Sequence, residues 1–299
     1  MMTAHFVGIL FGLGAAASQS VSYVFSRRFT RRAEGDVMLL LVVSFLIMGL
    51  AALALLVVMR PSGLPPLRTY VVPMAGAGAF CLIAQVGLFH VLHRVESSRV
   101  APLLGMKIVV LALLAVALTG QRLGVQQWTA VALCSGATWL LNEAGGRIPA
   151  RDIGVLMLTI LGYCASDLSI GVLMRRMTAV RPFAPLVAAA LTYVLTALLV
   201  LPFAFRRRVY SAEVWRTALP FAMAWFAAMC LLFGCFALAG VVFGNIVQSA
   251  RGLISIAGGW LLATMGHTHL ERKVGRRVFW SRMAGAILMV AAVVLYAAA

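Results

Sequence analysis

The sequence predicts an all-α membrane protein with ten transmembrane helices, arranged as two inverted five-helix repeats. Three observations support this fold class. Of the 299 residues, 63% are hydrophobic and only 11% are charged, which is too little polar material to cover a soluble domain of this size. The apolar residues gather into ten runs of about the 20 residues that cross a bilayer. The chain also resembles itself at a spacing of half its length.

The expected spans follow one another with short connections. They are 5–25, 37–59, 71–92, 98–119, 124–142, 153–174, 184–204, 217–239, 242–265 and 280–298. The longest loop, near 60–70, is rich in proline and glycine, and no soluble domain interrupts the series. The first run lacks a basic leader and a clear cleavage site, so we interpret it as a retained span.

The internal repeat is clearest in the first and sixth runs. Each contains Ala-Ser followed by a strongly polar residue, Gln19 or Asp167, and each ends in a pair of adjacent arginines. The second copy follows the first at a spacing of 148 residues. Because five spans separate equivalent segments, the second half must enter the membrane the opposite way up. Inverted repeats of this kind are typical of secondary transporters, whose substrate site lies near the midplane between the repeats. The expected repeats are 1–148 and 149–299.

The basic residues predict the orientation of the chain. The loops after spans one, three, five, seven and nine hold 17 of the 25 Lys and Arg residues, and the other loops hold 6. Cytoplasmic loops carry the excess of Lys and Arg, so this bias places both termini outside the cytoplasm. The net charge of +17 is spread between apolar runs, which favours contact with anionic lipid head groups and excludes a nucleic-acid reader. We expect a multi-pass protein of the cytoplasmic (inner) membrane.

Three charged residues fall deep inside expected spans: Lys107 in the fourth, Asp167 in the sixth and Arg251 in the ninth. A charge at this depth costs a few kcal/mol to insert, so each is a candidate for function. Lys107 and Arg251 can hold a phosphate or carboxylate. Asp167 can hold a substrate cation, take a proton, or pair with one of the two bases in the empty protein. The alternative interpretation is a structural ion pair with one cation left over.

Neutral polar residues surround these charges in the expected spans. On the ninth span, Asn245, Gln248, Arg251 and Ser255 recur at helical spacing and form one polar face. The proposed substrate-binding set is completed by residues from four other spans: Gln19, Gln85, Tyr163 and Trp225. For single serines an interhelical hydrogen bond is the simpler interpretation. His90 is either a proton relay or an ordinary interfacial residue.

Local motifs give a family resemblance. The first half has Ser-Ser-Arg-Val-Ala-Pro-Leu-Leu-Gly at 97–105 and Gly-Gln-Arg-Leu at 120–123, and the second half has Leu-Glu-Arg at 270–272 and Gly-Ala-Ile-Leu at 285–288. Together with ten spans in inverted halves, these resemble the drug/metabolite transporter superfamily, of the EamA-like kind. Gln121 stands where the family usually has Glu. The resemblance implies both termini in the cytoplasm, the reverse of the charge bias. Cations on spans four and nine also resemble the organic-phosphate branch, where such residues bind the phosphate.

The leading hypothesis is a secondary transporter that moves a small polar anionic or zwitterionic metabolite by alternating access. A flippase of a phosphorylated or anionic lipid is the alternative, and an intramembrane enzyme is a third. The chain has no nucleotide-binding loop, and its histidines and carboxylates form no catalytic constellation, so we expect no enzyme. The five cysteines lack ligand spacing, so we expect no metal and no cofactor. The expected partners are a small-molecule or lipid substrate and membrane lipids, with no nucleic acid, in a monomer or homodimer.

The charge bias gives a first testable prediction. A reporter enzyme that is active only in the cytoplasm, fused after Ala299, is expected to be inactive, because the bias places this end outside. The same fusion after the fifth span, near residue 147, serves as the positive control. Activity of the Ala299 fusion would show that the chain has the usual orientation of the superfamily.

Overall fold

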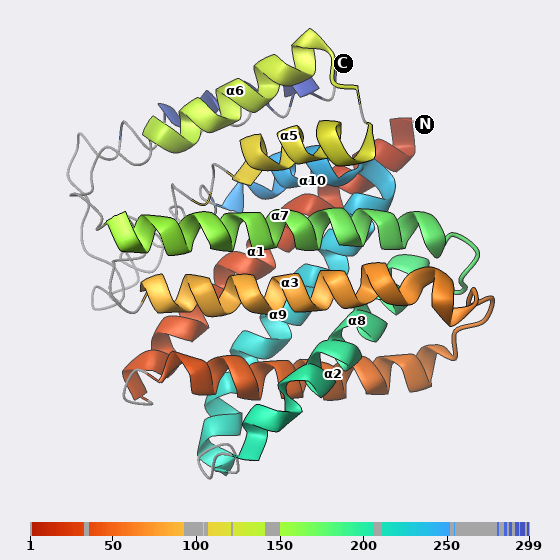
Figure 1. Ribbon diagram of the computed structural model, residues 1–299, viewed down its shortest axis with the longest axis vertical. Coiled ribbons are helices and arrows are strands. Elements are labelled where there is room, and N and C mark those ends of the chain that lie inside the picture. The colour runs from red at the N-terminus through yellow and green to blue at the C-terminus, as the bar shows by residue number, and fades with distance from the viewer. Residues whose placement is uncertain are drawn as a thin grey trace.

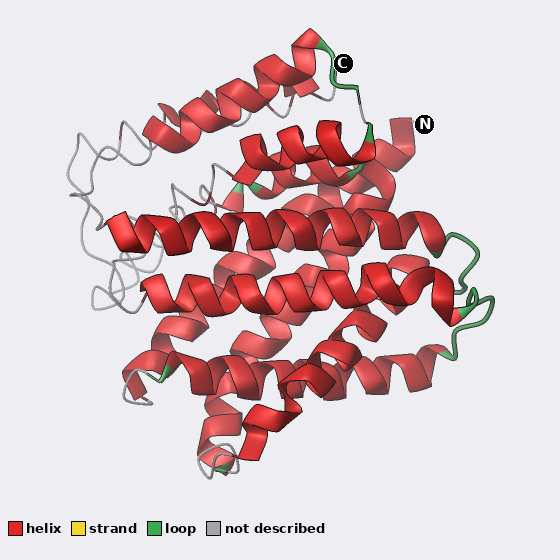
Figure 2. Ribbon diagram, viewed as in Figure 1, coloured by secondary structure: helices red, strands yellow, loops and turns green. Residues whose placement is uncertain are grey.

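The computed structural model describes residues 2–32, 36–92, 104, 107–120, 122–140, 150–205, 211–251 and individual positions between 254 and 298. Within these residues the elements are helices, joined by short loops, and the all-α class is confirmed (Figure 2). The elements are α1 (Met2–Arg32), α2 (Val37–Met59), α3 (Leu67–Leu92), α5 (Lys107–Thr119), α6 (Val125–Leu140), α7 (Ala150–Arg176), α8 (Ala184–Val200), the 3₁₀ turn η1 (Leu201–Phe205), α9 (Ala212–Ala239) and α10 (Val241–Gln248).

Six of the described helical segments are long and apolar enough to cross a membrane. They are α1, α2, α3, α7, α8 with η1, and α9. The described parts of α5, α6 and α10 are shorter, at 13, 16 and 8 residues. The structure describes the expected tenth span, 280–298, only at separate positions with gaps between them. A multi-pass membrane protein follows from the six long helices, and the layout of ten spans stays a prediction.

Helix α2 begins and ends at the predicted residues because the sequence caps it at both ends. The side chain of Asp36 accepts a hydrogen bond from the backbone N–H of Leu39 at 2.9 Å, which satisfies a free donor of the first turn. At the other end Arg60 adopts a left-handed conformation with φ of 45°, and its N–H donates to the carbonyl of Leu56. Pro61 follows and cannot continue the helix.

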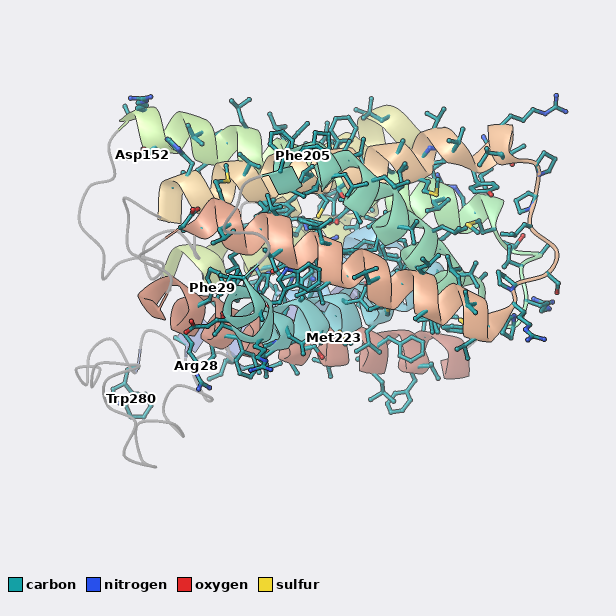
Figure 3. All side chains as sticks on the ribbon, turned by 90° about the horizontal axis from the view of Figure 1, so that it is seen from below. Arg28, Phe29, Asp152, Phe205, Met223 and Trp280 are labelled. Carbon is teal, nitrogen blue, oxygen red and sulfur yellow. The ribbon has the colours of Figure 1, made fainter. Side chains whose placement is uncertain are left out.

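The outer surface of the bundle is apolar. Phe205 and Met223, labelled in Figure 3, are 83% and 44% exposed, and Val58 on α2 is 79% exposed. In a soluble protein a surface of this kind marks an interaction site or an aggregation hazard. Here it suits contact with lipid chains, and the polar side chains discussed below lie inside the bundle instead.

Two long antiparallel pairs form the centre of the bundle: α1 packs along α9, and α3 packs along α7, as Figure 1 shows for α3 and α7. Glycines bring both pairs close together. A Cβ added at Gly8 of α1 would come within 3.0 Å of Ala239 on α9, and one at Gly162 of α7 within 3.1 Å of Ala84 on α3. Small residues allow membrane helices to approach in this way. Helices α2 and α8 also pack against each other.

Two loops meet at the end of the bundle where the described chain begins (Figure 1). The N–H of Ser62 donates to the carbonyl of Arg181 at 3.1 Å, and the N–H of Arg181 donates back to Ser62 at 3.0 Å. This reciprocal pair joins the loop after α2 to the loop after α7. Both loops therefore lie on one side of the membrane, as expected when four spans separate them.

The loop pair gives a second prediction. Opposed residues of a hydrogen-bonded antiparallel pair lie about 5.5 Å apart between Cα atoms, inside the range that a disulfide spans. The double variant Ser62→Cys/Arg181→Cys is expected to form an intramolecular disulfide under mild oxidation, detected as a linked peptide by mass spectrometry. The two single variants are the controls. If the double variant yields only unlinked peptides under the same oxidation, the two loops do not meet.

Candidate functional site

The first polar cluster surrounds Arg251, where α10 meets α1. The guanidinium donates to Gln19 Oε1 at 2.8 Å and to the hydroxyl of Tyr23 at 3.2 Å. It also lies 5.5 Å from the centre of the Tyr23 ring, within range of a cation–π contact. Gln248 donates its side-chain amide to the same oxygen of Gln19 at 3.1 Å. Gln19 thus accepts from two residues of the predicted polar face of span nine.

Helix α1 holds the backbone of this cluster as well as its side chains. The hydroxyl of Ser20 donates to the carbonyl of Arg251 at 3.2 Å. Gln19 and Gln248 are buried at 4% and 7% exposure. Polar side chains at this depth need partners, because a missing hydrogen bond is expensive away from water. The predicted residues Gln19, Gln248 and Arg251 therefore act as one hydrogen-bonded unit.

A turn in the backbone precedes Arg251, so the ninth span is not one continuous α-helix as predicted. Helix α10 ends at Gln248, and Ser249 and Ala250 form a turn in which Ala250 N–H bonds the carbonyl of Val247, three residues back. Such tightening is common at helix ends. Ser255 lies outside the described residues.

The second polar cluster is the ion pair between Lys107 on α5 and Asp167 on α7. The Nζ atom of Lys107 lies 2.6 Å from Asp167 Oδ2, and the two side chains are 16% and 5% exposed. Lys107 Nζ also lies 5.5 Å from the centre of the Tyr163 ring. The sequence left open whether Asp167 pairs with Lys107 or with Arg251, and in the structure it pairs with Lys107. Arg251, by contrast, pairs with no carboxylate among the described residues.

Tyr163 lies near both clusters. Its ring lies 5.5 Å from Lys107 Nζ of the second cluster, and its helix, α7, packs against α10, the helix that precedes Arg251. Helix α5, which carries Lys107, also packs against both α7 and α10. The two clusters therefore belong to one region inside the bundle. Counting Lys107, Arg251 and Asp167, this region carries one positive charge in excess.

Trp225 supports the first cluster from α9. Its ring meets Tyr23 edge-on at 6.1 Å between centroids, and its indole N–H donates to the hydroxyl of Tyr193 at 3.0 Å. Trp225 is 3% exposed and stacks on Phe221, so in this state it is a packing residue behind Tyr23. Sequence reasoning missed Tyr193. A tyrosine in the apolar run of α8 was the available signal, since a buried hydroxyl needs a partner.

The other predicted residues have separate surroundings. Asn245 is buried and donates to the carbonyl of Val241 on its own helix. Gln85 on α3 is 3% exposed, and its side-chain nitrogen has no hydrogen-bond partner among the residues that the structure describes. His90 is exposed in the last turn of α3. The five cysteines are free thiols, and no group of His, Cys, Asp or Glu in the described part of the chain could hold a metal ion.

The fold and this region together define a class: a multi-pass helical membrane protein whose helices enclose charged and polar groups. Residues 6–143 match the EamA-like transporter family. This match covers slightly less than half of the 299 residues, and over that segment it confirms the predicted resemblance to the family.

Comparison with solved structures supports the fold over the whole chain. A structure titled "Crystal structure of protein" is similar with a TM-score of 0.67 and 16% sequence identity, covering 96% of this chain and 95% of its own. At this identity the likeness concerns the fold alone. The comparison with curated proteins finds no match in sequence.

The ion pair gives a third prediction, on stability. Replacing Asp167 by Asn leaves the Lys107 charge buried without its partner, and breaking a buried pair in this way costs about 3 kcal/mol. The double variant Lys107→Met/Asp167→Asn is expected to lose less than the sum of the two single variants, in unfolding measured in detergent micelles. Glu213→Gln, which removes an exposed carboxylate, is the matched control. Additive losses would mean that the two side chains do not interact.

Proposed function

We propose that the protein is a secondary transporter of the cytoplasmic membrane that moves a small anionic or zwitterionic metabolite by alternating access. The observation that carries this proposal is Arg251: a cation inside the bundle, held by the neutral groups of Gln19 and Tyr23. A neutral partner positions a guanidinium but leaves its charge available. A substrate carboxylate or phosphate can then bind it with charge-assisted hydrogen bonds, bidentately where geometry allows.

We further propose that the two halves, 1–148 and 149–299, are inverted repeats that move against each other. The packing supports this. In such a repeat α1 and α7 are equivalent, as are α3 and α9, and the two most extensive pairings are α1 with α9 and α3 with α7. Exchanging equivalent helices turns one pairing into the other. Each of these pairings joins one half to the other, so both long interfaces lie where a rocking motion would act.

The two polar clusters are also related by the exchange of equivalent helices between the proposed repeats. Gln19 and Asp167 occupy equivalent positions 148 residues apart. Gln19 on α1 holds Arg251 beyond α10, and Asp167 on α7 holds Lys107 on α5. Each deep polar residue of one half thus holds a basic residue from the other half. A substrate anion that competes for Arg251 would loosen a contact between the halves, which connects binding to their movement.

The fourth prediction tests the proposed function through Arg251. Arg251→Gln is expected to lower the affinity for the substrate by about 10-fold or more, because charged hydrogen bonds are worth roughly 1.5–3 kcal/mol each. The measurement is a thermal-shift screen of the purified protein against phosphorylated metabolites, carboxylates and amino acids, followed by uptake of the binding class into proteoliposomes. Arg68→Gln, which removes an exposed arginine of α3, is the matched control.

The outcomes of this screen separate the proposals. Stabilisation by one class of anion that is lost in Arg251→Gln and kept in Arg68→Gln supports a metabolite transporter. Stabilisation by anionic lipids alone, sensitive to Arg251, would favour the lipid flippase. If no compound of any class stabilises the wild type, or if Arg251→Gln responds like the wild type, Arg251 is not the substrate site.

A further inference from the structure

We propose that Tyr163 contacts the substrate directly, with its hydroxyl donating a hydrogen bond to an oxygen of the anionic group that Arg251 binds. This inference deepens the proposed function and rests on it. It also narrows the substrate class to an oxyanion: a carboxylate, phosphate or sulfonate.

The first observation is an unused hydroxyl. The oxygen of Tyr163 is buried and has no hydrogen-bond partner among the described residues. Two neighbouring tyrosines are different: Tyr23 accepts from Arg251, and Tyr193 accepts from Trp225. A buried polar group without a partner destabilises a protein, and native structures rarely keep one without a reason. A ligand that is absent from this state supplies such a reason.

The second observation is where this hydroxyl sits. The ring of Tyr163 lies beneath Lys107 Nζ at 5.5 Å, and its helix, α7, packs against α10, which leads directly to Arg251. Both neighbours are cations and can only donate hydrogen bonds. An oxyanion placed beside them accepts from Arg251 and from the Tyr163 hydroxyl together. An oxyanion also carries the negative charge that matches the guanidinium, which makes its hydrogen bonds stronger than those of a neutral acceptor.

Gln85 extends the set of donors towards α3. Its side-chain nitrogen is a second buried donor without a partner in the described chain. It is adjacent to Ala84, which packs against Gly162, the residue before Tyr163 on α7. A substrate with a further oxygen beyond its anionic group would suit this donor.

The state of Asp167 argues against a zwitterion. A substrate ammonium group would need this carboxylate, but Lys107 occupies it at 2.6 Å. The charge that has no carboxylate partner in the described part of this region is the positive charge of Arg251. The side chains of Tyr163 and Gln85 also have hydrogen-bond donors that no described residue accepts from. Charge and hydrogen bonding therefore select the same kind of substrate.

The fifth prediction tests this assignment with Tyr163→Phe, which removes the hydroxyl and keeps the ring under Lys107. The probes are inorganic phosphate, glycerol 3-phosphate, malate and glutamate, measured by thermal shift and by titration calorimetry on the full-length protein in detergent. For the anion that binds, we expect Tyr163→Phe to raise the dissociation constant by about 10-fold, since a hydrogen bond to a charged group is lost. Its unfolding temperature without ligand should equal or exceed that of the wild type.

Tyr193→Phe is the matched control for stability. It leaves the indole N–H of buried Trp225 without its acceptor, so it should lower the unfolding temperature without ligand. If Tyr163→Phe lowers this temperature in the same way and leaves the dissociation constant unchanged, the hydroxyl is structural and the assignment is wrong. If Arg251→Gln loses binding while Tyr163→Phe keeps it, the proposed function is supported, and the proposed contact between Tyr163 and the substrate is wrong. If no probe binds the wild type, both fail.

Discussion

The cost of placing a charge inside a membrane is the constraint on which the centre of this protein depends. Insertion of Arg, Lys or Asp at the middle of a membrane helix costs roughly 2.5–3.5 kcal/mol. Lys107 and Asp167 offset part of this cost by pairing with each other. Arg251 is held instead by an amide oxygen, a hydroxyl and an aromatic face. Of these three charges, Arg251 therefore has no carboxylate partner within the described part of the chain, and the proposed function assigns this cation to the substrate.

The two repeated positions show how a small sequence difference sets this charge. Gln19 and Asp167 are equivalent by spacing, and both hold a basic residue. A carboxylate at position 19 would neutralise Arg251 as Asp167 neutralises Lys107. An amide supplies the same acceptor oxygen without the charge. The region remains positive for this reason, and the difference between the halves has a chemical meaning that a symmetric pair of carboxylates would lack.

Sequence reasoning predicted the parts of the fold that local patterns determine. The ends of α2 follow from a capping Asp36 and from Pro61, and the polar residues at depth stand out in apolar runs. The partner of Asp167 could not be predicted, because the choice between Lys107 and Arg251 depends on how α5 and α10 pack, and hydropathy carries no information on packing. The turn before Arg251 was missed for a related reason: Ser249 and Ala250 are compatible with an uninterrupted helix.

The role of Trp225 and Tyr193 was likewise set by tertiary structure. Sequence analysis included Trp225 among the neutral polar residues of the expected substrate-binding set. In the folded chain its polar end is satisfied by Tyr193, and the indole braces Tyr23 from behind. A side chain whose hydrogen bond is already made by the protein has little left to offer a ligand. The same reasoning, applied in the opposite direction, singles out Tyr163 and Gln85.

The turn before Arg251 connects the charge to possible movement. Interrupted helices in membrane proteins occur where freed backbone groups line a polar region, and they are common at transporter substrate sites. Here the carbonyl of Arg251 itself accepts from Ser20 on α1, so both the backbone and the side chain of this residue are tied to the opposite half. Under the proposed function, binding of an anion to the guanidinium would change the balance of these contacts next to the turn at Ser249 and Ala250. A short segment with a weakened hydrogen-bond ladder can respond to that change without disrupting α1 or α9, whose long packed interface keeps the two halves together.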